Sequence, residues 1–252
     1  MLELRGRPGP VIATAIHDGH EVRPEVAAGL AIHPDDRLRE EDPYTGRLTD
    51  IGDLGVVATR SRFEFDLNRP RERCVYRVPD DAWGLDVWRS PPDDDLCERS
   101  RVLYDRDHAV VDALVEAALA ECPEVLVLDL HSYNHRRGGP DDPGDPAKPL
   151  VDVGTKWVDT SRWGGAVDAF LDALRASRFA GVPIEPELNT PFGGGFLSQR
   201  VNGTYGDRVL VLSVELRKSF MDEWTGVLDD VRLGELRAAV RAAAHAARAT
   251  MQ

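Results

Sequence analysis

Cysteine is scarce in this chain, with three residues among 252. Cys74, Cys97 and Cys122 lie far apart, and no two of them form a CxxC pair. An odd number of isolated cysteines builds neither a disulfide framework nor a thiolate zinc site. The pattern is typical of a protein in a reducing compartment, so we expect a cytoplasmic location.

The chain also lacks an excess of positive charge and any long apolar run. Its 31 basic and 44 acidic residues give a net charge of −13. Such a surface repels nucleic acids and anionic membranes, so we expect neither as a partner. No segment approaches the roughly 20 apolar residues of a membrane span, and the first residues, MLELRGRPGP, have no apolar core typical of a secretion signal.

Three common active-site motifs are missing. There is no HExxH, which excludes the helical metalloprotease arrangement. The glycine-rich segment 189–195 (NTPFGGG) has neither GxGxxG nor GxxxxGK[ST] spacing, so we expect a flexible loop and not a nucleotide site. The candidates for chemistry are therefore the polar residues at the ends of predicted strands.

The most informative stretch is 124–137, with the sequence EVLVLDLHSYNHRR. Residues 125–128 are uninterrupted aliphatics, as in a central strand covered on both faces. Asp129, His131, Asn134 and His135 follow directly. Ligands of open α/β sheets bind beyond the carboxyl ends of strands, and an imidazole oriented by a carboxylate is typical of a catalytic metal ligand. Taken alone, the stretch also fits a histidine that caps a turn.

Two other predicted strands end in the same way. Residues 10–16 (PVIATAI) run into His17, and residues 208–216 (RVLVLSVEL) carry Glu215 near their end. Because the carboxyl ends of parallel strands meet at one edge of a sheet, we expect His17, His131 and Glu215 to converge there. Two histidines and a carboxylate with an open position describe a catalytic zinc site.

The rest of the chain alternates between strands and helices. The further predicted elements are strands at 54–59, 63–67 and 151–156, helices at 23–30, 105–122, 164–177 and 229–248, irregular connections at 72–97 and 138–149, and a charged, solvated surface segment at 33–53. With no internal repeat and no linker, this order predicts one α/β domain with a mixed, mostly parallel sheet flanked by helices.

Seven segments of the chain resemble the N-formylglutamate amidohydrolase (N-formylglutamate deformylase) family. They are IHDG, EEDPYTGRL, ATRSRFEFDLNRP, LDLHS, VDVGTK, NTPFGGGF and VELRKSFMDEWTG. They occur in the family's order over nearly the whole chain, and DLNRP together with DLHS is the most specific part. The family's fold is similar to zinc carboxypeptidases and aspartoacylase. The resemblance therefore implies a zinc-exopeptidase-like (phosphorylase/hydrolase-like) fold in a single domain over residues 1–252.

The resemblance implies a metal site built on His17 and His131. Zn²⁺ is the expected ion, although nitrogen and oxygen ligands accept other divalent metals. Carboxypeptidases place the third ligand three residues after the first histidine, where this chain has His20. Deformylase-like members place an acid in the segment matching EEDPYTGRL, where Asp42 aligns best. We expect Asp42, with Glu41 and Glu21 as the alternatives.

The resemblance also implies roles around the metal. Glu215 would be the general base that takes a proton from the attacking water and passes it to the leaving amine. Arg62 would stabilise the oxyanion. Asn68 and Arg69 would hold a substrate carboxylate, which a guanidinium matches in a planar, two-bond geometry. Asn189 would line the acyl pocket.

Each role has a structural alternative. Glu215 could be an exposed acid at a strand end, and Arg62 could bind an acidic loop. Asn68 and Arg69 could belong to a surface turn, and Asn189 to a plain loop. Asp129 could orient a metal ligand or simply cap a strand.

These residues predict hydrolysis of the amide of a small anionic N-acyl amino acid. N-formyl-L-glutamate is the first candidate, with formate and glutamate as products and a place in histidine breakdown. The surroundings of His20 and the segment 83–97 diverge from the family pattern, so zinc-dependent amide hydrolysis is better supported than this substrate. The alternatives are a carboxypeptidase-like hydrolase of short peptides or cell-wall fragments, and a non-catalytic relative that binds an acidic metabolite. The sequence carries no signal for the oligomeric state.

Overall fold

A seven-stranded sheet organises the chain, which a computed structural model describes over residues 1–251. In spatial order its strands are β1 (Leu2–Gly6), β3 (Leu54–Ala58), β2 (Val11–Ala15), β4 (Val125–Tyr133), β9 (Val209–Arg217), β5 (Val151–Gly154) and β8 (Glu187–Leu188). Two strand pairs of this sheet, β1 with β3 and β5 with β9, are antiparallel, and its other pairs within residues 1–251 are parallel. The prediction of a single α/β domain with a mixed, mostly parallel sheet is confirmed.

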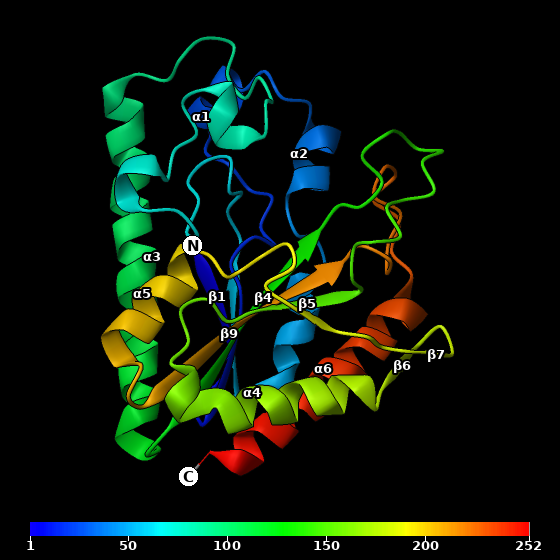
Figure 1. The fold of residues 1–252 in the computed structure, drawn as a ribbon. Coiled ribbons are helices and arrows are strands. Elements are labelled where there is room, and N and C mark those ends of the chain that lie inside the picture. Colours follow the sequence, from blue (N-terminus) through cyan, green and yellow to red (C-terminus); the bar gives the residue numbers. More distant parts are fainter. Residues whose placement is uncertain (252) are drawn as a thin grey trace.

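Helices cover both faces of the sheet (Figure 1). The α-helices are α1 (Pro24–Gly29), α2 (Pro34–Glu40), α3 (Asp94–Glu121), α4 (Thr160–Arg175), α5 (Phe196–Tyr205) and α6 (Asp230–Thr250), with short 3₁₀ turns at Thr45–Ile51, Arg71–Arg73 and Pro79–Ala82 and a small hairpin of β6 (Arg178–Phe179) and β7 (Val182–Pro183). Helices α3 and α5 pack on one face, and α4 and α6 on the other. No helix within residues 1–251 is long and apolar enough to cross a membrane.

The surroundings of β4 explain why residues 125–128 are all apolar. Its even-numbered residues Leu126 and Leu128 pack in the core under α4 and α6, whereas Val125 and Val127 pack under α3 and α5. Side chains of a strand alternate between the two faces, so both sets must be apolar when both faces are covered. Strand β4 pairs with β9 along its whole length, so the alternation of its side chains continues to residue 133.

The length of β4 corrects one detail of the prediction. Asp129 and His131 lie inside the strand and not after it. Being two residues apart, they share one face of the sheet. Likewise, helix α3 begins at Asp94, well before the predicted start at residue 105. The Asp93 side chain accepts a hydrogen bond from the amide of Leu96 and caps this charged first turn, which apolar periodicity does not reveal.

Two sequence predictions were wrong. Residues 63–67 form turns and irregular backbone and not a strand. Their alternation arises because Phe63 and Phe65 pack in apolar clusters while Glu64 and Asp66 are buried among polar partners. The charged segment 33–53 is not solvated throughout, because Glu40, Glu41 and Asp42 are buried and residues 45–51 form a 3₁₀ helix against the sheet. Hydrogen bonds from distant residues, which no local pattern shows, make both arrangements possible.

Candidate metal centre and active site

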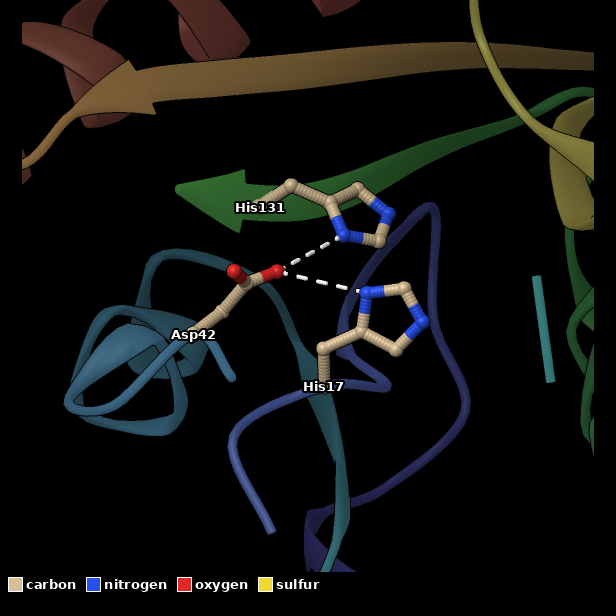
Figure 2. Close-up of side chains that lie close together, drawn as sticks. All are labelled: His17, Asp42 and His131. Atoms are coloured by element: carbon tan, nitrogen blue, oxygen red, sulfur yellow. Dashed lines mark hydrogen bonds and ion pairs between the residues drawn. The ribbon is translucent and has the colours of Figure 1, made fainter. Parts of the chain in front are cut away.

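Three buried side chains from separate segments meet at the carboxyl end of the sheet (Figure 2). His17 lies in the turn after β2, His131 lies in β4, and Asp42 follows α2. Asp42 Oδ2 is 3.3 Å from His17 Nδ1 and 3.1 Å from His131 Nδ1. The candidate ligand atoms of the three residues all lie within 4.8 Å of one another. The two imidazoles therefore present the same ring nitrogen to one carboxylate oxygen.

This donor set fits a divalent metal ion. His17 Nδ1 is buried and lies 3.3 Å from Asp42 Oδ2 without forming a hydrogen bond to it, and it has no other hydrogen-bond partner within residues 1–251. A buried polar atom without a partner is costly and calls for an explanation such as a bound ion. Two imidazoles and one carboxylate are a known ligand set of catalytic zinc sites, in which the fourth position stays open.

Each imidazole has a second carboxylate at its outer nitrogen. His17 Nε2 lies 2.7 Å from Asp66 Oδ1, and His131 Nε2 lies 3.0 Å from Asp129 Oδ2. Asp129 also accepts a hydrogen bond of 2.8 Å from the Thr14 hydroxyl. Carboxylates in this position fix the tautomer and the ring orientation of metal-binding histidines. Asp129 thus lies where a role in orienting His131 requires it.

Asp66 is the main residue that the sequence reasoning missed. Asp66 is fully buried and lies against His17. It accepts hydrogen bonds from the backbone amide of Asn68 (2.7 Å), from Arg62 Nη2 (2.9 Å) and from the Tyr76 hydroxyl. Burial opposes its ionisation, but Arg62 and His17 outweigh burial and hold the pKa of Asp66 well below its usual value. A signal existed, because Asp66 is the first residue of the DLNRP motif.

Glu215 approaches the same site from β9. It stands directly across from His131 in the paired strands and lines the cavity beside the three candidate ligands. Burial raises the pKa of Glu215 to about 8, although His131 lowers it. A carboxyl group beside a candidate metal centre, with a pKa raised by burial, is suited to proton transfer.

The site opens into a cavity of about 350 Å³. Seven of the eight predicted site residues line the cavity, and the exception is Asn189. The seven are His17, Asp42, Arg62, Asn68, Arg69, His131 and Glu215. Its wall is completed by side chains that include Glu40, Trp83, Tyr133, Asn134, Arg137 and Lys218, and by residues 191–195. A cavity of this size accommodates a small metabolite.

Arg62 is held rigidly at the cavity wall. Its Nη2 donates to Asp66 and its Nε donates to the Tyr76 hydroxyl at 2.9 Å. The Trp83 ring lies 4.8 Å from the guanidinium carbon. Despite burial, Asp66 raises the pKa of Arg62 above its usual value, so the side chain is a fixed cation.

Asn68 and Arg69 differ in how firmly they are held. The Asn68 side-chain oxygen accepts a hydrogen bond from the Leu197 amide at 3.0 Å, and its Nδ2 lies 3.4 Å from His131 Nε2. The Arg69 guanidinium is one-third exposed, and its contact with Asp66 is 4.0 Å long. Arg69 is therefore less firmly held than Asn68, and its guanidinium is available to an incoming carboxylate.

Asn189 does not line the cavity, contrary to the sequence prediction. Its side chain is used locally, because Oδ1 accepts from the Thr155 amide at 2.8 Å and Nδ2 donates to the Thr155 hydroxyl at 3.0 Å. The residue adopts a left-handed backbone with a φ of 55° and ties the glycine loop to the end of β5. The following residues of that loop, 191–195, reach the cavity instead.

The other acids considered as ligands point elsewhere. Glu41 is buried, but its carboxylate contacts His20 and the Ser61 hydroxyl. Glu21 accepts a hydrogen bond from the Thr59 hydroxyl at 3.0 Å at an exposed position. Only Asp42 of the three alternatives joins the two histidines among the described residues.

The last polar residues of the central stretch have separate partners. His135 pairs with the buried carboxylate of Glu223 and not with the candidate ligands. Asn134 donates from Nδ2 to the carbonyl of Arg39 at 2.9 Å. Lys218, which the sequence analysis did not single out, is fully buried and lines the cavity.

Comparison with protein families gives one family whose model matches most of the chain. The model described as N-formylglutamate amidohydrolase matches residues 9–221. No curated protein matches the chain in sequence.

Solved structures share the fold at low sequence identity. The N-formylglutamate amidohydrolase from Ralstonia eutropha JMP134 superposes with a TM-score of 0.75 at 19% identity, over 98% of this chain and 97% of the other. A gene product from Agrobacterium tumefaciens gives 0.72 at 15% identity, over 99% and 95%. A metallo-carboxypeptidase from Burkholderia cenocepacia gives 0.43 at 18% identity, over 100% of this chain and 61% of the other, which is too low to inform the fold.

Proposed function

Because the chain belongs to the N-formylglutamate amidohydrolase family, we propose that it is a metal-dependent hydrolase of a small N-acyl amino acid, with N-formyl-L-glutamate as the first candidate. The single observation that carries the proposal is the convergence of His17, Asp42 and His131 in a cavity that Glu215 also lines. In this proposal the amide carbon–nitrogen bond is cleaved, and formate and free glutamate are released.

His17, Asp42 and His131 would hold the metal ion. Zn²⁺ is our first choice, and another divalent ion would also suit nitrogen and oxygen ligands. When bound, such an ion polarises a carbonyl group and makes water a nucleophile near neutral pH. Asp66 and Asp129 would keep the outer imidazole nitrogens occupied, so that Nδ1 of each ring stays turned to the ion.

Glu215 and Arg62 would do the chemistry of the chain itself. Glu215 would take a proton from the attacking water and deliver it to the nitrogen of the leaving amine. Arg62 is a fixed cation at the wall of the same cavity, where negative charge develops on the carbonyl oxygen. Preorganised donors of this kind are worth several kcal/mol, about 2.7–4 for one donor in a known case.

Asn68 and Arg69 would bind the substrate carboxylate. The glycine loop supports a small acyl group, because its three consecutive glycines, 193–195, line the cavity without side chains beside Pro191 and Phe192. At Gly195 a Cβ atom would lie 2.3 Å from the Asn68 side chain, so glycine is needed there to keep Asn68 in place. A formyl group is the smallest acyl group that such a wall could receive. Formate and glutamate as products would place the reaction in cytoplasmic histidine breakdown.

The test is formate release by the purified protein, stripped of metal and then supplied with Zn²⁺, Co²⁺ or Mn²⁺. We expect activity on N-formyl-L-glutamate that depends on the added ion, with N-acetyl-L-glutamate and dipeptides as comparison substrates. Faster cleavage of dipeptides would replace the proposal with a carboxypeptidase-like function. A protein that binds no metal ion and cleaves none of these substrates would contradict hydrolysis altogether.

A further inference from the structure

Lys218 is an unusual residue to find in the interior, with 1% of its surface exposed. Burying an ammonium group is costly unless hydrogen-bonding partners replace water. The Lys218 Nζ donates to two backbone carbonyls, Arg39 O and Glu41 O, each at 2.6 Å. The lysine is therefore bound to the chain segment that leads into Asp42.

This segment is the end of helix α2. The last carbonyls of a helix have no partner inside it and attract cations. Arg39 O lies in this last turn, and it receives a second donor, Asn134 Nδ2, at 2.9 Å. Two side chains from outside the helix thus hold one carbonyl, and Lys218 holds another one just before Asp42.

The two donors come from equivalent places on the two central strands. His131 and Glu215 face each other in the paired register of β4 and β9. Asn134 lies three residues after His131, and Lys218 lies three residues after Glu215. Each strand therefore supplies one residue to the site and, just past its end, one donor to the segment before Asp42.

Asp42 needs such support because it lies outside the sheet. Its amide donates to the His17 carbonyl at 2.9 Å, and its own carbonyl accepts from the Thr45 hydroxyl. These bonds fix the backbone of Asp42 itself. The bonds from Lys218 and Asn134 fix the residues just before Asp42 relative to the ends of β4 and β9.

We infer that Lys218 and Asn134 are positioning residues, which clamp the segment 39–41 and thereby hold Asp42 at ligand distance from both histidines. The inference rests on the proposed metal site, since it assigns the origin of that site's geometry. Neither residue needs to touch the substrate in this role.

The experiment compares Zn²⁺ affinity in wild-type protein, Lys218→Met and Lys156→Met, by competition with a chromophoric chelator. Lys156 is an exposed lysine, so its substitution removes the same charge without touching the Asp42 segment. We expect Lys218→Met to weaken Zn²⁺ binding by about 10–100-fold, as residues that orient metal ligands do. Lys156→Met should bind as wild type does. Excess Zn²⁺ should restore formate release by Lys218→Met with an unchanged KM.

A helix cap that only stabilises the fold would give a different result. Lys218→Met would then lower the melting temperature of the metal-free protein but leave the Zn²⁺ affinity of the folded protein unchanged, which would overturn the inference. A double-mutant cycle sharpens the test. If Lys218 acts through Asp42, then Lys218→Met should have much less effect in an Asp42→Asn background. Full additivity would also overturn it.

Asn134→Ser provides a second route if Lys218→Met does not fold. It removes one of the two donors to Arg39 O and should weaken Zn²⁺ binding several-fold, whereas an unchanged affinity would overturn the clamp. The proposed function fails separately. Wild-type protein that binds no divalent ion would overturn both proposals, while wild-type protein that binds metal with the same affinity as Lys218→Met would overturn the clamp alone.

Discussion

His131 and Glu215 lie inside paired strands, whereas Asp42, Arg62 and Asp66 lie in segments that belong to no strand. The position of the first pair is set by the backbone ladder of β4 and β9, which runs from Val125 to Tyr133 without a break. The positions in the second group are set by side-chain hydrogen bonds together with single backbone bonds, such as the one from the Asp42 amide to the His17 carbonyl. The site therefore has a sheet half and a loop half, which are stabilised differently.

The difference predicts how each half tolerates substitution. In the sheet half, many backbone bonds share the task of holding one side chain. In the loop half, single residues hold several others, as Asp66 does for His17, Arg62 and the Asn68 amide. A substitution that removes one such residue should therefore disturb several functions together.

The largest effect is expected where the two halves meet, at the proposed metal ligands. His131→Ala in the sheet half and Asp42→Ala in the loop half should each reduce formate release to background, because two ligands are too few for a catalytic zinc site. Chelation of the wild-type protein should do the same, and added Zn²⁺ should reverse it. Measuring bound zinc and formate release checks this. Either variant retaining both would remove that residue from the site.

Glu215→Gln is expected to have the next largest effect. The amide keeps the shape of the side chain but cannot take a proton, so kcat should fall by about 10²–10⁴-fold. Bound zinc should stay at the wild-type level, because Glu215 is not among the converging ligand atoms. Steady-state kinetics with metal analysis separates the two effects. Equal rates in wild type and variant would remove Glu215 from the mechanism.

Asp66→Asn and Asp129→Asn test the contrast between the halves directly. Both change the carboxylate at the outer nitrogen of an imidazole, and each should weaken Zn²⁺ binding by about 10–100-fold. Asp66→Asn should also raise the KM for N-formyl-L-glutamate, since the Asp66 carboxylate also accepts hydrogen bonds from Arg62 and from the backbone amide of Asn68. Asp129→Asn should leave KM nearly unchanged. If both variants changed KM equally, the loop half would not be distinct.

The same contrast explains what the sequence could predict. Hydrophobic runs locate strands, and the ends of parallel strands locate a site, so His17, His131 and Glu215 were placed at one edge from local patterns. Asp42 came from the family resemblance, because its burial depends on residues far along the chain. For the same reason, the local pattern of the charged segment that contains Asp42 predicts solvated surface.

Residues 63–67 show the limit most clearly. Their alternation of apolar and acidic residues matches a half-exposed strand, yet the acids are buried too. Glu64 is paired with Arg23 and Arg60, and Asp66 with Arg62 and His17. A period of two in hydrophobicity does not show whether the polar residues face solvent or a buried cation. The strand prediction was therefore wrong, and the pattern gave no sign of the role of Asp66.

Thr14→Val is expected to have the smallest effect on the metal centre. The Thr14 hydroxyl donates to Asp129 Oδ1 at 2.8 Å, and the two residues face each other in the register of β2 and β4. Valine keeps the shape of threonine, so the loss is one hydrogen bond to a buried carboxylate, about 1–3 kcal/mol of folding stability. The change in Zn²⁺ affinity should stay below about tenfold, because the strand ladder still holds Asp129 beside His131.

Chemical denaturation and chelator competition on the same preparation measure the two quantities of Thr14→Val. Loss of stability with nearly unchanged zinc affinity would support a sheet half that is held by its backbone. Zinc binding weakened as much as in Asp66→Asn would show instead that the position of Asp129 depends on one side chain. The sheet half would then be as dependent on single residues as the loop half, and the distinction between them would be lost.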